Sequence, residues 1–155
     1  MRFEDFYRTE FPQVFRTVSL TLGDDEAAKD VTQEAFKRAY ARWRRLSKES
    51  WAGGWVTTTA LNLSRRHRSK PRPTQMPAEL DGEVGRQTDP SSRVDVSRAL
   101  RELPFKQRQV VVLFYIRDLP VPAIAAAMSI SEGTVKAHLD QGRKALRSLL
   151  EVRHG

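Results

Sequence analysis

Apolar side chains near the start of the chain recur at intervals of three and four residues. This spacing places them on one face of a helix, so the pattern predicts an amphipathic helix up to Leu22. Pro12 lies inside the pattern and is expected to kink this helix or split it in two. Gly23 is predicted to end it, with Asp24 or Asp25 capping the next helix. The apolar positions are Phe3, Phe6, Tyr7, Phe11, Val14, Phe15, Val18 and Leu22.

Two further helices are predicted before residue 70. One runs from the aspartate cap to about Arg45, with Phe36 and Tyr40 on the edge of its apolar face. A polar loop over 47–54 separates it from a third helix, which starts at Trp55 and continues to about Arg68. The residues expected to face the core are Ala28, Val31, Ala35, Ala39, Trp43, Val56, Ala60 and Leu63.

The last third of the chain shows the same helical periodicity in shorter pieces. Pro104 sits at a natural first-turn position of a strongly apolar helix, which is expected to bury Val110, Val111, Leu113 and Phe114. The predicted elements are helices at about 94–103, 105–116, 123–128 and 132–150, with turns at 118–122 and 129–131.

Residues 71–92 interrupt the helical pattern. They contain four prolines, two glycines and several short polar residues, a composition typical of a flexible linker. No long alternating strand pattern occurs anywhere in the chain. The sequence therefore predicts an all-α protein with two small helical domains, 1–70 and 93–155, joined by a flexible linker at 71–92.

Charge adds to this picture. The chain has 155 residues, a formal net charge of +8 and a sequence pI near 10.3. Both predicted domains are basic and the linker is acidic. A basic balance favours polyanionic partners such as nucleic acid, although a soluble basic protein would show it as well. There is no cysteine, which removes disulfides, thiolate metal sites and thiol nucleophiles.

The segment from Pro122 to Leu146 has the pattern of a helix-turn-helix. Ser131 is placed to cap the second helix, with Thr134 three residues on. Ser129 falls where such turns often have a glycine with positive φ, at a cost of about 1 kcal/mol for serine. Apolar residues that would lock the helices together are Ile124, Ala127, Ile130, Val135, Leu139 and Leu146. Those left toward solvent are Lys136, His138, Asp140, Gln141, Arg143 and Lys144. An ordinary helical hairpin with a basic face would have the same pattern.

A polar stripe marks the second predicted helix. Asp30, Gln33, Glu34 and Lys37 recur at helical spacing opposite the residues expected in the core. On its own, such a stripe is usually only a solvated helix face.

Taken together, these motifs resemble a known family. Asp30-x-x-Gln33-Glu34-Ala35-Phe36, with a later Asn62-x-x-x-Arg66, resembles region 2 of the extracytoplasmic-function sigma factors. Leu103-Pro104-x-x-Gln107-Arg108-x-Val110-x-x-Leu113 looks like the start of their region 4. Ile124-Ala125, Ile130-Ser131-x-Gly133-Thr134-Val135-Lys136 and Arg143 look like its continuation. The resemblance covers nearly the whole chain in the right order.

The resemblance implies a promoter-directed transcription initiation factor. Its partners would be bacterial core RNA polymerase and promoter DNA, with an anti-sigma factor as a further candidate partner. Core polymerase would be bound by Asp30, Gln33, Glu34, Phe36 and Lys37. Single-stranded −10 DNA would be bound by Trp51, Trp55, Asn62, Arg65, Arg66 and Arg68. The −35 duplex would be read by Ser131, Thr134, Lys136, Ala137, His138, Asp140, Gln141, Arg143 and Lys144. Thr57, Thr58 and Thr59 depart from the bulkier or more basic residues expected beside the −10 strand.

No catalytic site is expected. The sequence has no phosphate-binding glycine loop, and its three histidines lack metal-ligand spacing, so no cofactor or metal is predicted. The chain has no apolar run near the roughly 18 residues of a membrane helix and no signal peptide, which predicts a cytoplasmic protein. Two alternatives stay open: a stand-alone helix-turn-helix regulator, and a helical adaptor that binds RNA or an acidic protein without sequence preference.

Overall fold

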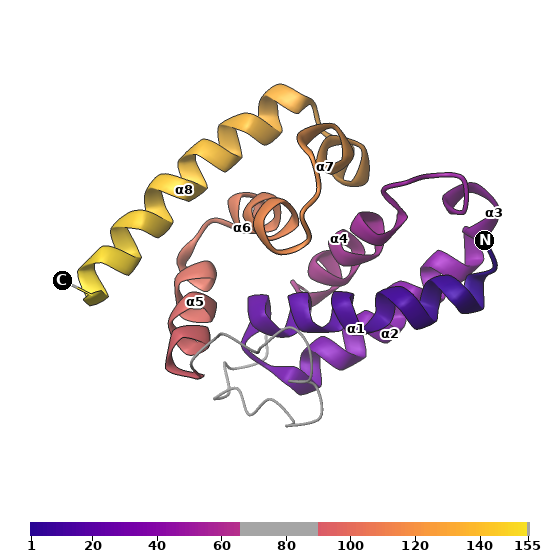
Figure 1. Ribbon diagram of the computed structural model, residues 1–155, viewed down its shortest axis with the longest axis horizontal. Helices are drawn as coiled ribbons and strands as arrows, with labels where there is room; N and C mark the ends of the chain where they lie inside the picture. The colour runs from indigo at the N-terminus through magenta and orange to yellow at the C-terminus, as the bar shows by residue number, and fades with distance from the viewer. Residues whose placement is uncertain (66–89, 155) are drawn as a thin grey trace.

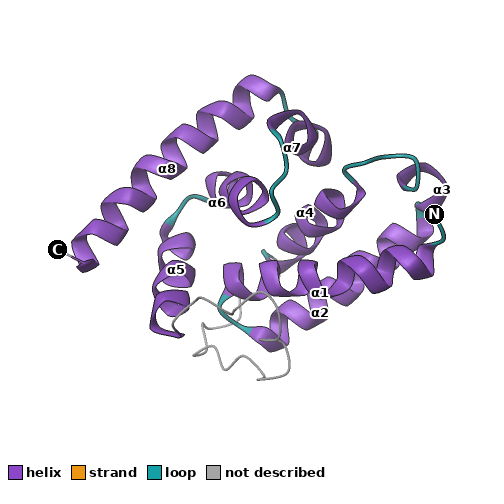
Figure 2. Cartoon of the chain, viewed as in Figure 1, coloured by secondary structure: helices purple, strands orange, loops and turns teal. Residues whose placement is uncertain are grey.

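The computed structural model describes residues 1–65 and 90–154, with side chains for 1–65 and 95–151. These residues form helices and no strand, as the sequence predicts (Figure 2). The helices are α1 (Phe3–Leu22), α2 (Asp25–Ala41), α3 (Trp43–Leu46), α4 (Ala52–Ser64), α5 (Pro90–Glu102), α6 (Phe105–Val111), the π-helix η2 (Val112–Ile116), α7 (Val121–Met128) and α8 (Glu132–His154).

The N-terminal domain is built from α1, α2 and α4, which pack against one another in all three pairs. Small residues on α2 let the helices approach closely: Ala28, Ala35 and Ala39 are all fully buried. Val14 and Val18 of α1 complete this core. Of the residues predicted to face the core, all are buried except Trp43, which is half-buried.

The turn between α1 and α2 follows the predicted chemistry. Gly23 ends α1 in the left-handed conformation, with φ of 70°, and its N–H donates to the Ser19 carbonyl. Glycine is favoured here because it has no Cβ to clash in that conformation. Asp24, rather than Asp25, caps α2, because its Oδ1 accepts a hydrogen bond of 3.0 Å from the Ala27 N–H.

Three predictions in this domain need correction. First, of the two outcomes expected at Pro12, a kink or a split, the split does not occur: α1 is one helix, and Pro12 lies on its exposed face. The carbonyl four residues earlier, on exposed Arg8, can therefore bond to water in place of the missing N–H. Second, α2 ends at Ala41, and the chain turns at Arg42 into the short α3. This turn brings Trp43 against Phe6, with ring centroids 4.7 Å apart.

The third correction concerns α4. It starts at Ala52 and not at Trp55, so Gly53 and Gly54 lie in its first turn and not in the predicted loop. Both glycines are buried. Their positions favour helix despite the poor helix propensity of glycine, because tertiary packing around them outweighs that propensity.

The C-terminal domain consists of α5 to α8, and α8 is the long helix along its outer side (Figure 1). Leu100, Leu113, Ile124 and Val135 are each about fully buried and join its four helices into one core. The predicted helix over 105–116 is instead an α-helix that passes into the π-helix η2, where the Arg117 N–H donates to the Val112 carbonyl. Phe114, expected in the core, is only half-buried.

The two domains touch along α1 with α5 and along α4 with α7. Helix α5 begins at Pro90, so the last three residues of the stretch predicted as linker are helical. Proline fits there because the first turn of a helix needs no N–H donor. The rest of the predicted linker, 71–89, lies outside the described residues.

Candidate functional site

The turn before α8 is held by two local devices. Ser129 has φ of 57° and ψ of 46°, which confirms the predicted positive φ at this position. Ser131 then caps α8: its Oγ accepts a hydrogen bond of 3.1 Å from the Thr134 N–H and lies 2.8 Å from Thr134 Oγ1. The first turn of α8 is therefore fixed in direction relative to α7, which is what a recognition helix requires.

Helix α8 has one buried and one open side. Val135 and Leu139 are buried against the rest of the domain. The opposite side presents short polar groups followed by cations, with Lys144 in an exposed ion pair of 3.3 Å to Asp140. Such a face can enter a groove and grip phosphates at its edges. Its exposed residues are Ser131, Thr134, Lys136, Ala137, Asp140, Gln141, Arg143 and Lys144.

His138 departs from the predicted solvent-facing set. It is half-buried, and its Nδ1 is buried without a hydrogen-bond partner. The reason is helical spacing: His138 lies three residues after Val135 and therefore shares its inward face. Only the remainder of this ring is available to a ligand.

The polar stripe of α2 is exposed as predicted. Asp30, Gln33, Glu34 and Lys37 all face solvent. They form one wall of a groove of about 520 Å³ between α1 and α2. Glu34 also makes an exposed pair of 3.6 Å with Arg38 on the next turn. The groove gives the stripe a neighbouring apolar surface, which a merely solvated helix face would lack.

The other wall of this groove is aromatic. Phe3, Tyr7 and Tyr40 line it, and Tyr40 is 65% exposed while its ring meets that of Phe3 at 5.0 Å. Sequence reasoning placed Phe3 and Tyr7 in the core stripe of α1 and so missed them as surface residues. Phe36, predicted to contact polymerase, is only 2% exposed and forms the floor of the groove.

A second, smaller pocket of about 200 Å³ lies between α2 and α4. Trp55 forms part of it, with the Arg42 guanidinium 5.8 Å from the ring centroid. A flat ring beside a cation suits an unstacked base and its phosphate. The lining residues are Arg38, Arg42, Trp55, Thr59, Asn62 and Leu63. Both arginines were missed from sequence. Arg42 was missed because α2 was predicted to continue straight through it, whereas Arg38 lies in α2 as predicted and nothing local pointed to the pocket.

The threonine run divides between core and surface. Thr57 and Thr58 are buried, and the Thr57 hydroxyl donates to the Gly53 carbonyl at 2.9 Å. Only Thr59 reaches the pocket. Two of the three departures from the expected −10 pattern are therefore structural residues. Trp51 packs half-buried on the core and does not line the pocket of Trp55.

The far end of α4 meets the C-terminal domain. Asn62 Oδ1 accepts a hydrogen bond of 2.9 Å from Gln109 Nε2, and the Arg65 guanidinium stacks over Phe105 at 4.5 Å. The predicted −10 residues Trp55, Asn62 and Arg65 thus lie along one helix. Arg66 and Arg68, predicted with them, lie outside the described residues.

Arg108 of the family motif has a structural position. Its Nη2 donates to the carbonyls of Arg101 and Leu103 at 3.0 and 3.1 Å, at the end of α5. Burial, with a smaller contribution from the neighbouring Arg101 charge, lowers the pKa of Arg108 below its usual value. Arginine nevertheless stays charged at neutral pH, so Arg108 satisfies carbonyls that a helix end leaves without partners.

Comparison with known families identifies both halves of the chain. Residues 6–73 match the family described as Sigma-70 region 2, and residues 93–146 match Sigma-70, region 4. The chain is 30% identical over 159 residues to the RNA polymerase sigma-E factor of Streptomyces avermitilis. That alignment covers 99% of this chain and 87% of its relative. The chain therefore belongs to the sigma-70 family of RNA polymerase sigma factors.

Its relatives also define the group within that family. The chain is 27% identical over 150 residues to the ECF RNA polymerase sigma factor SigM of Mycobacterium tuberculosis, covering 96% of this chain and 76% of that protein. Its fold matches that of the sigma factor RpoE from Bartonella quintana, solved with the anti-sigma factor NepR. The TM-score is 0.73 at 21% identity over 97% of both chains. The protein is an extracytoplasmic-function sigma factor, which acts with RNA polymerase in promoter-directed initiation.

Sigma factors are regulatory proteins without catalytic activity of their own. Within residues 1–65 and 90–154, no group of three or more histidine or acidic side chains could hold a metal ion. Within the same ranges, no helix is long and apolar enough to cross a bilayer.

Proposed function

We propose that the groove between α1 and α2 docks the chain on core RNA polymerase. The observation that carries this proposal is the combination of an aromatic wall and a polar wall along one exposed groove of about 520 Å³. Aromatic anchors beside a polar rim are typical of protein–protein interfaces. Asp30, Gln33, Glu34 and Lys37 supply the polar contacts, and Phe36 supports them from below. Tyr7 and Tyr40 add the anchors.

The second part of the proposal assigns DNA contacts to two helices. The exposed face of α8 reads −35 duplex, with its first turn near base edges and Arg143 and Lys144 near phosphates. Helix α4 holds the separated −10 strand, with Trp55 stacking a base and Arg42 and Arg65 beside the backbone. Because these α4 contacts form only after strands separate, binding shifts the DNA toward the melted state.

This division of labour corresponds to domains at 1–70 and 93–155 with a linker at 71–92. We infer that the chain works by binding alone, without catalysis, and in the cytoplasm, where polymerase acts on DNA. A relative in Bartonella was solved with an anti-sigma factor, and we propose that a protein of that kind can control this chain as well. The stand-alone regulator is not favoured, because residues 6–73 match a sigma region and not a sensor domain.

The test is competition between this chain and a housekeeping sigma factor for core RNA polymerase. The wild-type chain is expected to displace its rival at sub-micromolar concentration. The variant Gln33→Ala/Glu34→Ala is expected to bind at least roughly tenfold more weakly, since both side chains are exposed and interface hot spots contribute about 1–2 kcal/mol or more each. Its far-UV dichroism should stay unchanged, because neither residue belongs to the core.

A matched control is Glu102→Ala, which removes an exposed acid at the end of α5, away from the groove. It should compete like wild type. Equal affinity of the double variant and the control would remove the stripe from the proposal. No displacement by the folded wild-type chain would overturn polymerase docking altogether.

A further inference from the structure

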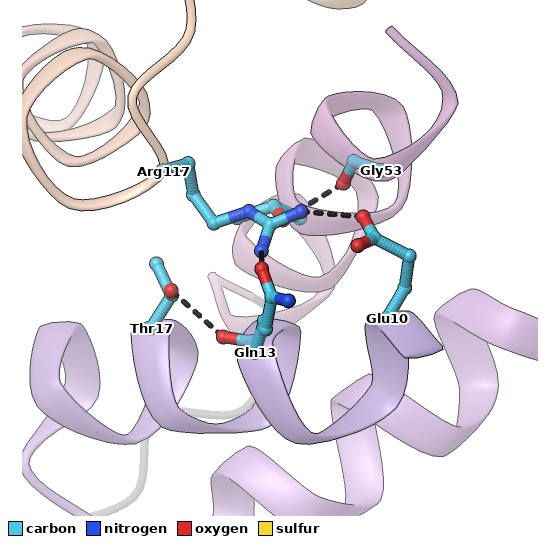
Figure 3. Close-up of polar contacts among 6 residues, drawn as sticks. Glu10, Gln13, Thr17, Gly53 and Arg117 are labelled. Atoms are coloured by element: carbon cyan, nitrogen blue, oxygen red, sulfur yellow. Dashed lines mark hydrogen bonds and ion pairs between the residues drawn. The ribbon is translucent and has the colours of Figure 1, made fainter. Parts of the chain in front are cut away.

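A polar cluster joins the two domains (Figure 3). Arg117, which follows η2, donates from Nη2 to Glu10 Oε1 at 2.6 Å and from Nη1 to Gln13 Oε1 at 2.8 Å. Glu10 and Gln13 lie one turn apart on α1. The Arg117 side chain is 7% exposed and that of Glu10 is 19% exposed. A charge pair so far withdrawn from water is stable only when its geometry and further hydrogen bonds are good. Both terminal nitrogens of Arg117 are bonded in this cluster, while its Nε is buried without a partner. We call Glu10, Gln13 and Arg117 the latch.

The surface that receives the latch is shaped by the two glycines of α4. A Cβ on Gly53 would lie 2.7 Å from Arg117 Nη2, and a Cβ on Gly54 would lie 2.6 Å from Leu119 Cδ1. The nearest atom to a Cβ on Gly53 is Glu10 Oε1, so a larger residue there would displace the paired ends of Glu10 and Arg117, and one at Gly54 would displace the Leu119 side chain. Glycine is a poor helix former, and two in the first turn of a buried helix disfavour the helix locally. Close approach of the Glu10–Arg117 pair and of Leu119 is the feature of the structure that favours glycine at these positions.

The segment that enters this surface has an unusual backbone. The π-helix η2 widens the helix just before Arg117, and Asp118 follows with φ of 53°, a conformation uncommon for a residue with a side chain. The Leu119 N–H returns to the Leu113 carbonyl at 3.0 Å. Together these features turn Arg117 and Leu119 toward the N-terminal domain. Strained backbone persists only where surrounding contacts hold it, and the latch supplies such contacts.

Closure of the two domains occupies part of the proposed −10 surface. Gln109 is fully buried, and its amide donates to Asn62, while Phe105 covers the Arg65 guanidinium. Both α4 residues are among those assigned to the −10 strand. Both side chains remain exposed, so the overlap is partial: Gln109 occupies the Asn62 Oδ1, and Phe105 covers one face of the Arg65 guanidinium. The polymerase groove and the outer face of α8 remain exposed in this closed form.

We propose that the latch holds the free chain closed and withholds single-strand capture until the two domains separate. The inhibitory part of this inference rests on the proposed role of α4, whereas the closed state itself does not. In the closed form, the chain's own C-terminal domain covers part of the α4 surface. A contact that only adds stability would not change DNA affinity when broken.

The closed state is tested by the distance between the domains. The natural chain has no cysteine, so Lys48→Cys and Ser148→Cys, both at exposed positions, allow specific labelling of the full chain for electron–electron distance measurement. The labelled wild type should give one narrow distance distribution. Arg117→Glu or Glu10→Arg alone should broaden it toward longer distances. The double swap Glu10→Arg/Arg117→Glu should restore the narrow distribution, because the ion pair is rebuilt in reverse. One unchanged distribution in all four chains would overturn the latch.

The inhibitory role is tested by binding of a fluorescein-labelled, mixed-sequence single-stranded 15-mer. Arg117→Gln removes a cation, which by charge alone weakens binding to DNA. If closure blocks α4, this variant should instead bind roughly 3–10-fold more tightly, since apparent affinity scales with the open fraction. Gly53→Ala, which opens the interface without a charge change, should do the same. The control Arg147→Gln loses the same charge from an exposed site on α8 and should bind slightly more weakly.

The outcomes separate the two claims. Chains that open without any gain in single-strand affinity would overturn inhibition. Failure of the sigma-factor assignment would appear elsewhere, as no competition for core polymerase, and that measurement does not depend on the state of the latch.

Discussion

Two helices of this sigma factor are assigned to DNA, and the fold presents them in opposite ways. Helix α8 lies on the outside of its domain, and the residues proposed to contact DNA face solvent from the capped first turn onward, except half-buried His138. Helix α4 is a central element, with nine of its thirteen residues buried, and the other domain already contacts Asn62 next to its end. The surface proposed to read duplex is therefore open in this structure, whereas the surface proposed to hold the single strand is partly covered.

This difference matches the order in which the two DNA forms exist. Duplex DNA is available before initiation starts, but a separated −10 strand exists only after melting. A permanently open single-strand surface on a basic chain would bind stray single-stranded nucleic acid, because stacking and phosphate contacts are tolerant of sequence. Under the proposal, partial occupation of α4 would reduce that binding and would leave the proposed duplex reading by α8 unaffected.

The largest expected effect is a loss of stability in the C-terminal domain, which carries α8, without a loss in the N-terminal domain, which carries α4. Ile124 is fully buried between α7 and α8, and Ile124→Ala should destabilise the C-terminal domain by about 2–5 kcal/mol through lost contacts and a cavity. Native-state hydrogen exchange should show faster exchange of α7 and α8 amides, with α1 and α2 unchanged. The control Ile130→Ala, at a half-buried position, should cost less. Equal acceleration in α1 and α2 would show that the domains unfold as one unit.

The next effect tests whether Lys136 of α8 contacts a base or a phosphate in duplex DNA. Lys136 is exposed on its outer face, and Lys136→Ala should lose roughly 1–3 kcal/mol of binding to a selected duplex if the lysine contacts a base. Binding is measured with polymerase present on duplexes selected from a random library. A uniform loss on all sequences, with the salt slope reduced by about one, would instead assign Lys136 to phosphate.

A smaller effect concerns the start of α8. Ser131→Ala removes the side-chain acceptor of the Thr134 N–H and should destabilise the helix by about 1 kcal/mol. Hydrogen exchange in the first turn of α8 reports this loss, while Ser131→Asp, another good cap, should retain protection. Unchanged protection in Ser131→Ala would mean that the turn is held by packing alone.

The smallest expected effect is a gain in stability of the turn between α7 and α8. Ser129 has a left-handed backbone, so Ser129→Gly should stabilise the turn by about 0.5–1 kcal/mol, the relief of strain being partly offset by unfolded-state entropy. Slower exchange of α8 amides is the expected readout, with Ser148→Gly, inside the helix, as a destabilising control. A loss of protection in Ser129→Gly would indicate that the serine side chain stabilises the turn.

Sequence reasoning succeeded where short-range chemistry decides the structure. Gly23, Ser129 and Ser131 act within three or four residues of their own positions, so their roles follow from residue type and spacing alone. The cap of α2 was predicted only as Asp24 or Asp25, and the structure shows that it is Asp24. The exposed polar stripe of α2 follows in the same way from helical periodicity. The residue roles in polymerase and DNA binding remain predictions.

Sequence reasoning failed where distant parts of the chain meet. Glu10 and Arg117 are 107 positions apart, and nothing local to either one indicates the other. Gly53 and Gly54 have the composition of a loop, and only their close neighbours Glu10, Arg117 and Leu119, all distant in sequence, explain why glycine stands in this helix. His138 was assigned by charge type to solvent, although its spacing from buried Val135 already indicated the inward face.

The π-helix η2 has a consequence for the ancestry of this protein. A π-helical turn contains one residue more than the α-helical turn it replaces, so η2 is equivalent to a single-codon insertion in a regular helix. Deleting one residue from Val112–Ile116 would let α6 continue as an α-helix and rotate everything after it by about 100°. Arg117 would then point away from Glu10. Relatives that lack this one residue should have no counterpart of the interdomain ion pair, whatever residue follows the helix.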